Sequence, residues 1–169
     1  LDVASINEIT DFVNGKSAKS INPILYHSFD KTSKDKDTEF IDGRKKTTIS
    51  KTMDFAEGVS GLAARFDHQD DAIHINHFGR FESTDPFSIS IWAYPESSSD
   101  KTSVLIGNAH QKNTMFRGWD LYIDSVGHVA TRLISSLPHN YIHVRSAEKM
   151  PVGEWTHLTM TYDGSSKAK

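Results

Sequence analysis

The segment 87–94 alternates strictly between two kinds of side chain, and this pattern constrains the fold more than any other feature of the sequence. Phe87, Ile89 and Ile91 fall on one face of an extended chain, whereas Ser88 and Ser90 fall on the other. A period of two residues is typical of a strand in an antiparallel sheet. The segment 155–162 repeats the pattern further along the chain. Two such strands with shorter ones between them favour a β-sandwich.

Turn residues separate several other short apolar segments. Pro86 precedes one expected strand, and Ser125-Val126-Gly127 predicts a tight hairpin in which Gly127 has a positive φ. The spacing fits an all-β fold with strands over 24–29, 62–66, 72–76, 87–94, 103–107, 119–124, 128–134, 141–146 and 155–162. Residues 30–58 carry only weak strand signal, as at 47–49, so we expect an irregular excursion there.

The first residues predict one short helix. Ser5 and Glu8 have the spacing of a capping box, and Ile6, Ile9 and Phe12 share one apolar stripe. A linker up to residue 23 follows. We therefore expect an N-terminal helix and linker over 1–23 and a β-sandwich over 24–169.

Charge and composition exclude several classes of protein. The formal net charge of −3 provides no basic field for phosphates, so nucleic acid is not an expected partner. No run approaches the roughly 18 consecutive apolar residues of a membrane span, and we expect no membrane insertion by this segment. The chain has no cysteine and hence no disulfide framework and no thiolate nucleophile. Because it begins at Leu1, we expect a processed chain or an excised fragment.

Several ordered motifs carry a resemblance to a known family. They are Gly58-Val-Ser-Gly-Leu-Ala-Ala-Arg-Phe-Asp67, Asp71-Ala-Ile-His-Ile75, Asp85-Pro-Phe-Ser-Ile-Ser-Ile-Trp92, Gly118-Trp-Asp-Leu-Tyr122 and Gly153-Glu-Trp-Thr-His157 with Tyr162-Asp-Gly164. Over residues 24–169 the chain resembles the laminin-G-like branch of the concanavalin A-like lectin/glucanase superfamily. The Asp85 run, His143-Val-Arg145 and Asp163-Gly-Ser-Ser166 are similar to the module embedded in planctomycete-type multidomain proteins with cytochrome-c-like domains.

The resemblance implies a jelly-roll sandwich of two antiparallel sheets, usually non-catalytic and attached to exported bacterial multidomain proteins. It therefore implies a periplasmic or cell-surface location, with neighbouring domains of the parent chain as partners. Members of the family continue past the Asp-Gly pair with a further strand and end on a strand that pairs back to the first. The resemblance thus implies that the module is incomplete at its C-terminus.

Enzymes of the superfamily hydrolyse β-glucans with carboxylates in a Glu-x-Asp-x-Glu pattern on one strand, and retaining chemistry needs a separation of roughly 5 Å. The sequence lacks this pattern. Glu39 and Asp42 have the wrong spacing, and Asp120 and Asp124 have no third partner. We expect no enzymatic activity in this domain, with glycoside hydrolysis as the weaker alternative.

An acidic turn is the best candidate for a metal site. Asp67, Asp70 and Asp71 lie close in sequence, and calcium prefers several carboxylate and carbonyl oxygens from one turn. Similar modules hold a structural calcium near this turn, and a merely solvated turn is the alternative. Zinc at His74 and His77 is a weaker prediction, because the two side chains would converge only if the loop folded back.

Sugar binding requires an aromatic face for the apolar side of a pyranose and nearby planar polar groups for its hydroxyls. Two groups of residues qualify. The first is Trp92 with Tyr94, and the second is Tyr141, His143 and Arg145 with Arg117, His139 and Asn140 in adjoining loops. The alternatives are a core position for Trp92, Trp119 and Trp155, and a cross-strand polar ladder for residues 139–145.

These observations predict a non-catalytic carbohydrate-binding module, with a glycan as its ligand and a structural calcium as its candidate metal. The alternative from another class is a structural or protein-docking module that binds no sugar. An exposed aromatic face on a curved sheet favours the first, and a flat polar sheet favours the second.

Overall fold

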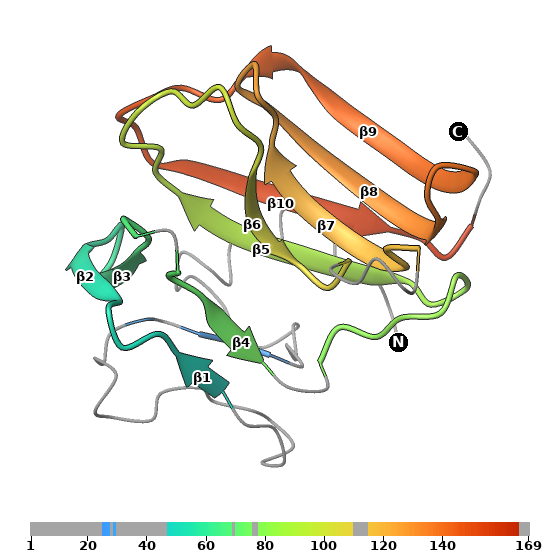
Figure 1. Cartoon of the computed structure of the whole chain (residues 1–169), viewed down its shortest axis with the longest axis horizontal. Helices are drawn as coiled ribbons and strands as arrows, with labels where there is room; N and C mark the ends of the chain where they lie inside the picture. Colours follow the sequence, from blue (N-terminus) through green and yellow to red (C-terminus); the bar gives the residue numbers. More distant parts are fainter. Residues whose placement is uncertain are drawn as a thin grey trace. The chain divides into compact units, whose positions relative to one another are not determined.

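The computed structural model describes residues 25–27, 29, 47–68, 70–75, 78–109 and 115–165 (Figure 1). Within these residues the chain is all-β and contains no helix, as predicted. The strands are β1 (Thr47–Ile49), β2 (Asp54–Glu57), β3 (Leu62–Arg65), β4 (Ile73–Ile75), β5 (Phe87–Ala93), β6 (Ser103–Gly107), β7 (Gly118–Ile123), β8 (His128–Ser136), β9 (Asn140–Lys149) and β10 (Thr156–Tyr162). The part of the chain that the structure describes holds no helix that could span a membrane.

The contacts divide the chain into two compact units. The described strands of one unit are β5 to β10, and those of the other are β1 to β4. The predicted helix within 1–23 lies outside the described residues, so the predicted boundary between 1–23 and 24–169 stays a prediction.

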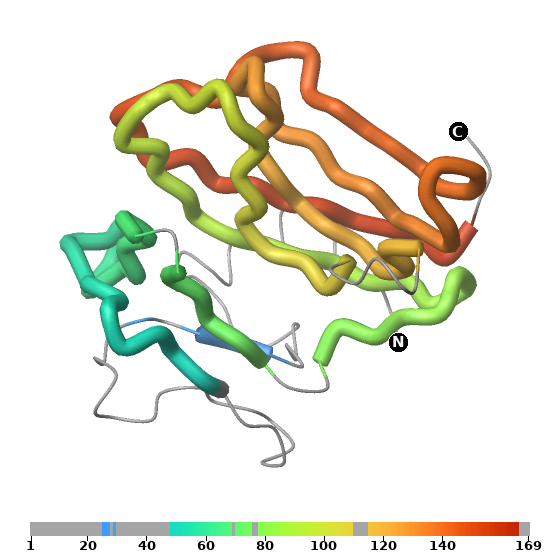
Figure 2. Tube along the Cα trace, viewed as in Figure 1, coloured from blue at the N-terminus to red at the C-terminus, as the bar shows by residue number. Residues whose placement is uncertain are grey.

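The larger unit contains two antiparallel sheets. β6, β7, β8 and β9 follow one another in order, whereas β10 pairs with β5 over Thr156↔Ala93 to Tyr162↔Phe87. Figure 2 traces how the chain leaves β5, runs through the four-stranded sheet and returns to lie beside β5. The ladder between β8 and β9 is irregular, because Lys149 pairs with His128 and Arg145 with Ala130. Between these two pairs, β9 advances by four residues and β8 by only two, so β9 bulges here.

The core of this unit lies between its two sheets. Phe87 from β5, Trp119 from β7 and Met160 from β10 are buried together, and Ile106 and Leu133 pack against them. The Phe87 ring lies 5.7 Å from that of Trp119. The predicted alternation is confirmed, because Phe87 and Ile89 contribute to this core while Ser88 and Ser90 lie on the opposite face of β5.

Tight turns connect the strands where the sequence predicts them. Gly127 has a φ of 96° between β7 and β8, and its N–H donates to the carbonyl of Asp124. The predicted hairpin is thus confirmed. Gly107 allows β6 and β7 to approach closely, because a Cβ at this position would lie 2.8 Å from the Cβ of Asp120 on the neighbouring strand.

The strands of the smaller unit differ from the irregular excursion expected over residues 30–58. β1 pairs with β4 and β2 with β3, so the region 47–58 contains two strands and is not wholly irregular. β2 was missed because its sequence, Asp-Phe-Ala-Glu, has a single large apolar residue. Of the strand expected at 24–29, the structure describes four residues, and Tyr26 forms an isolated bridge.

Candidate functional site

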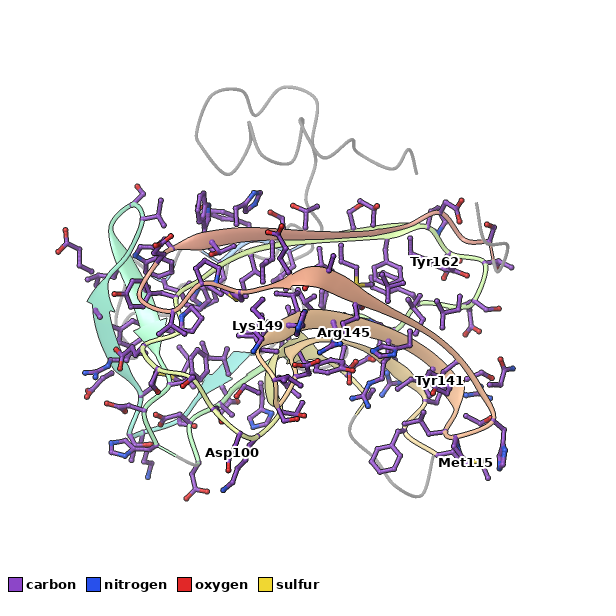
Figure 3. All side chains as sticks on the ribbon, turned by 90° about the horizontal axis from the view of Figure 1, so that it is seen from above. Asp100, Met115, Tyr141, Arg145, Lys149 and Tyr162 are labelled. Atoms are coloured by element: carbon purple, nitrogen blue, oxygen red, sulfur yellow. The ribbon has the colours of Figure 1, made fainter. Side chains whose placement is uncertain are left out.

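The two groups of candidate sugar-binding residues lie on opposite sides of the sandwich. Tyr141, His143 and Arg145 alternate along β9 with Ile142 and Val144. Val144 pairs with Thr131, whose hydroxyl contacts the sulfur of core residue Met160, so Val144 is on the core side. The other three side chains therefore lie on the face turned away from β5 and β10, which we call the outer face. Figure 3 shows the sheet bent, with Tyr141 and Arg145 on its concave side.

A partly buried ion pair joins β7 and β8 on the outer face. Asp120 on β7 is only 3% exposed, and the Nε and Nη2 atoms of Arg132 on β8 donate to its two carboxylate oxygens. Asp120 and Arg132 are directly opposite in the ladder, so the strand register itself sets the pair. The hydrogen bond from Arg132 to Asp120 raises the pKa of the guanidinium. The two side chains thus satisfy each other's hydrogen-bonding groups across the strands.

Tyr122 extends this array across the sheet. The guanidinium of Arg132 lies 4.6 Å from the centre of the Tyr122 ring, within the range of a cation–π contact. The Tyr122 hydroxyl lies 3.1 Å from Nε2 of His143 on β9. Burial raises the pKa of Tyr122, so its hydroxyl stays protonated at neutral pH. Asp120, Arg132, Tyr122 and His143 thus form one continuous polar array over three adjacent strands.

A second ion pair fixes Arg145 further along β9. Its Nε donates to Oδ2 of Asp124 over 2.7 Å. Oδ1 of Asp124 accepts the backbone N–H groups of Val126 and His128, each at 2.9 Å. Both carboxylates of the outer face are therefore occupied by donors of the protein.

The remaining candidates gather where β8 turns into β9. His139 and Asn140 are exposed at this turn, and Tyr141, 44% exposed, follows them. Nε of Arg117 donates weakly to the carbonyl of Ser135 at 3.4 Å, which places Arg117 at the same end of the sheet. Tyr141, His143 and Arg145 thus share the outer face, whereas Arg117, His139 and Asn140 lie at the end of the sheet where β8 turns into β9.

Two exposed apolar residues beside this turn were not among the predicted site residues. Met115 and Phe116 both have positive φ, and the N–H of Leu137 in the turn donates to the carbonyl of Met115. Left-handed backbone is strained for such residues and clusters at functional sites. Figure 3 shows Met115 near the same end of the sheet as Tyr141. No turn motif at these positions predicts this backbone, so the pair could not be found from the sequence pattern.

The base of the loop that carries Met115 and Phe116 is closed by one side chain. The Oδ1 atom of Asn108 accepts the N–H of Trp119 at 2.9 Å, and its Nδ2 donates to the carbonyl of Gly79. The backbone N–H of Asn108 also donates to the carbonyl of Trp119. The described ends of the loop are therefore held at a fixed separation.

The first candidate group lies on the other sheet, on the face of β5 and β10 that points away from the core. Trp92 is half-buried and its ring lies 4.9 Å from that of His157, while the Tyr94 ring lies 5.4 Å from that of Trp155. Oγ of Ser90 lies 2.7 Å from Nε2 of His157. Of the three tryptophans, all of which the structure describes, only Trp119 is a buried core residue. Trp92 and Tyr94 consequently cannot share one site with Tyr141.

A family model described as the concanavalin A-like lectin/glucanases superfamily, of the laminin-G type, matches residues 67–169. The match covers more than half of the chain. The chain belongs to this superfamily. No curated protein and no solved structure matches it. The all-β structure with its antiparallel sheets is consistent with the superfamily's sandwich.

Donors of the protein itself cap the acidic turn, and calcium at this turn stays a prediction. Oδ1 of Asp71 accepts the hydroxyl of Thr52 at 2.7 Å, and Oδ2 accepts the N–H groups of Asp67 and His68. The carbonyl of Asp70 accepts a bond from Ser50. These bonds lower the pKa of Asp71, that from Thr52 most strongly, and they cap the turn without a metal. Among the residues that the structure describes, no three histidine or carboxylate side chains converge on a cation site.

The histidine pair proposed for zinc is only half described. His74 lies exposed on β4 opposite Thr48, and His77 is outside the described residues. The Nε2 atom of His68 lies 3.5 Å from Oδ1 of Asp67. Among the described residues, this is the one ion-pair contact between a histidine and a carboxylate of this turn. Zinc at this position therefore stays a prediction without a described ligand pair.

Proposed function

We propose that the chain is a non-catalytic carbohydrate-binding module of a larger exported bacterial protein, and that its site is the outer face of β7, β8 and β9. The observation that carries this proposal is the exposed ring of Tyr141 beside the fixed array of Arg132, Tyr122 and His143. An aromatic ring suits the apolar side of a pyranose, and planar polar groups suit its hydroxyls. Membership of a superfamily that includes lectins supports the same function.

The state of the carboxylates supports a binding role over a hydrolytic one. Glycoside hydrolysis needs one carboxyl group that donates a proton and another that acts as nucleophile or base. Asp120 uses both oxygens for Arg132, and the pKa of Asp124 is held at about 2 by the N–H of His128, that of Val126 and the guanidinium of Arg145. Asp124 is therefore not poised to donate a proton near neutral pH, and the oxygens of Asp120 are engaged by Arg132.

A structural or docking module without a sugar ligand is the second candidate. The observation that favours it is Val144, which is 58% exposed although it lies on the core side of β9. β9 is also an edge strand of the described sheet, and edge strands present unpaired backbone groups. A neighbouring domain that packs here would cover both features.

Two exposed tyrosines on opposite sides of the sandwich provide a matched test. Tyr141 is 44% exposed on the outer face, and Tyr94 is 43% exposed on the far sheet. We would screen the protein, Tyr141→Ala and Tyr94→Ala on one glycan array, with and without calcium, after confirming the fold of each by circular dichroism. We expect glycan binding that Tyr141→Ala removes and Tyr94→Ala preserves.

The other outcomes separate the alternatives. Loss of binding with Tyr94→Ala alone would move the site to the face of Trp92 and His157. An absence of binding to a broad array by the folded protein would reject the carbohydrate-binding function and favour the docking module.

A further inference from the structure

We infer that residues 1–18 cover the face of β5 and β10 that points away from the core. The contact is made by the apolar stripe that the sequence predicts in this segment. We call the covered surface the back face, and its members are Ser88, Ser90, Trp92, His157 and Thr159. The inference concerns how the chain packs on itself and does not rest on the proposed function.

The back face is less exposed than a free sheet face should be. Antiparallel sheets commonly pack one face on the core and leave the other to solvent. In β5, however, Phe87 is buried and the remaining residues are half-buried, so neither face of the strand is exposed. By contrast, every residue of β9 except Ile142 is exposed. The four-stranded sheet covers one side of β5, and something further covers the other.

Individual atoms of the back face are also shielded from solvent. The hydroxyl oxygens of Ser88 and Thr159 are buried, and neither has a hydrogen-bond partner among the described residues. Burial lowers the pKa of His157, although its side chain points away from the core. Tyr94 and Thr161, at opposite ends of the same two strands, are exposed. The cover therefore lies over the middle of the strands.

Residues 1–18 fit this position by their length and by the unit to which they belong. The contacts group Leu1–Ala18 with Gly79–Lys169 in one compact unit. Two other stretches of that unit, 110–114 and 166–169, lie outside the described residues, and each is shorter than the seven residues of β5. Among the stretches of this unit that are not described, residues 1–18 are therefore the one long enough to cover both strands.

The sequence gives this segment an apolar side that requires a partner. Ile6, Ile9 and Phe12 share one side of the helix predicted after Ser5, and Asn7 falls nearly opposite Ile9. A helix over 5–13 would be about 13 Å long and a seven-residue strand is about 23 Å long, so the helix fits within the face. Burial of the stripe against the sheet would remove its apolar surface from water.

The cover determines which side of the sandwich is open to other molecules. With residues 1–18 in place, the half-buried ring of Trp92 would be closed to a ligand. Tyr141, 44% exposed on the opposite sheet, would stay open. The packing of the N-terminal segment thus separates a closed aromatic face from an open one.

Cysteine accessibility tests this cover in the full chain, which has no cysteine of its own. We would measure the rate of maleimide labelling at Ser88→Cys, at the exposed Tyr141→Cys and at the buried Ala130→Cys, after confirming each fold by circular dichroism. Each measurement is repeated with Ile9→Asp, which places a charge in the stripe. Asn7→Asp is the matched control, because it adds the same charge on the other side of the predicted helix.

We expect Ser88→Cys to react at least about tenfold more slowly than Tyr141→Cys, and Ile9→Asp to raise its rate by a similar factor, because a carboxylate in the stripe disfavours the covered state. Asn7→Asp should leave that rate unchanged, and Ala130→Cys should stay protected with either substitution. In a second measurement, a short bismaleimide should link Ile9→Cys to Ser88→Cys but not to Tyr141→Cys.

Three results would overturn the inference. Labelling of Ser88→Cys as fast as that of Tyr141→Cys would show that the back face is open. A protected Ser88→Cys that does not respond to Ile9→Asp would assign the cover to another part of the chain. If Ile9→Asp also exposes Ala130→Cys, the substitution disturbs the whole fold and the cross-link decides, so that a lack of the Ile9–Ser88 product rejects the contact.

Discussion

The guanidinium of Arg145 and the carboxylate of Asp124 join the edge strand β9 to the hairpin between β7 and β8, with Nε and Oδ2 2.7 Å apart. The same carboxylate accepts two backbone N–H groups of the hairpin. One side chain therefore holds both a turn and a strand that carries candidate binding residues.

Replacement of Asp124 by asparagine should destabilise the fold at neutral pH in a pH-dependent way. Hydrogen bonds from the N–H groups of His128 and Val126 and from Arg145 hold the native pKa at about 2, below the unfolded value near 4. The stabilisation is therefore complete above the unfolded pKa and is lost as the pH falls toward 2. Urea unfolding at pH 7, 4 and 3 should show the difference between wild type and Asp124→Asn shrinking below pH 4.

Asp100→Asn is the control for this experiment, because Asp100 is exposed in the loop before β6. It should change the unfolding free energy little at any of these pH values. A difference for Asp124→Asn that stays constant from pH 7 to 3 would contradict the assigned role of the carboxylate.

Trp119→Phe should cost about 1–3 kcal/mol of unfolding free energy, from the lost hydrogen bond and the small cavity. The Trp119 side chain is buried in the core, and its Nε1–H donates to the carbonyl of Gly79 at 2.7 Å. Trp155→Phe is the matched variant, since Trp155 is half-buried and contacts Tyr94. Chemical denaturation should show the larger loss for Trp119→Phe, and equal losses would contradict the position of the core.

Because of His157, the free energy of unfolding should fall on mild acidification. Burial lowers its pKa, so the unfolded chain takes up a proton at a higher pH than the folded one. The folded state then loses stability as the pH falls below the ordinary histidine value near 6.5. His157→Gln, which retains a hydrogen-bonding partner for Ser90, should flatten the stability profile between pH 7 and 5.

The exposed His74 on β4 provides the control, and His74→Gln should leave the slope of that profile nearly unchanged. The assignment fails if the two variants change the slope by the same amount.

Millimolar calcium should leave the melting temperature unchanged. The oxygens of Asp71 already accept the hydroxyl of Thr52 and the N–H groups of Asp67 and His68, and the described acidic side chains of this turn do not converge on one cation site. Differential scanning fluorimetry with calcium and with a chelator tests this directly. A rise of several degrees that Asp71→Asn removes would show that the turn rearranges around the ion.

The pattern of the sequence predicts most of the strands of the larger unit. β5 and β10 alternate strictly, and a strand that buries one face must follow this pattern. The hairpin at Gly127 follows from the requirement for a positive φ. By contrast, β2 contains only one large apolar residue and gains its pairing from β3, which no local pattern reveals.

The candidate site was predictable only in part. Alternation places Tyr141, His143 and Arg145 on one face, and the structure confirms that placement. The ion pair of Asp120 with Arg132 depends on the register between β7 and β8, and the separation of Trp92 from Tyr141 depends on which sheet each strand joins. Both are long-range properties that single-strand periodicity does not carry.

The irregular ladder between β8 and β9 affects how readily another strand could pair with β9 at the edge of the sheet. Ser146 accepts the N–H of Val129 and donates to the carbonyl of Glu148, so this part of β9 departs from the regular backbone repeat. A strand that approached the open border of the sheet would find matching groups along only part of its length. The irregular part of β9 therefore hinders edge-to-edge pairing between copies of the protein, while the regular part of β9 keeps Tyr141 and His143 in place.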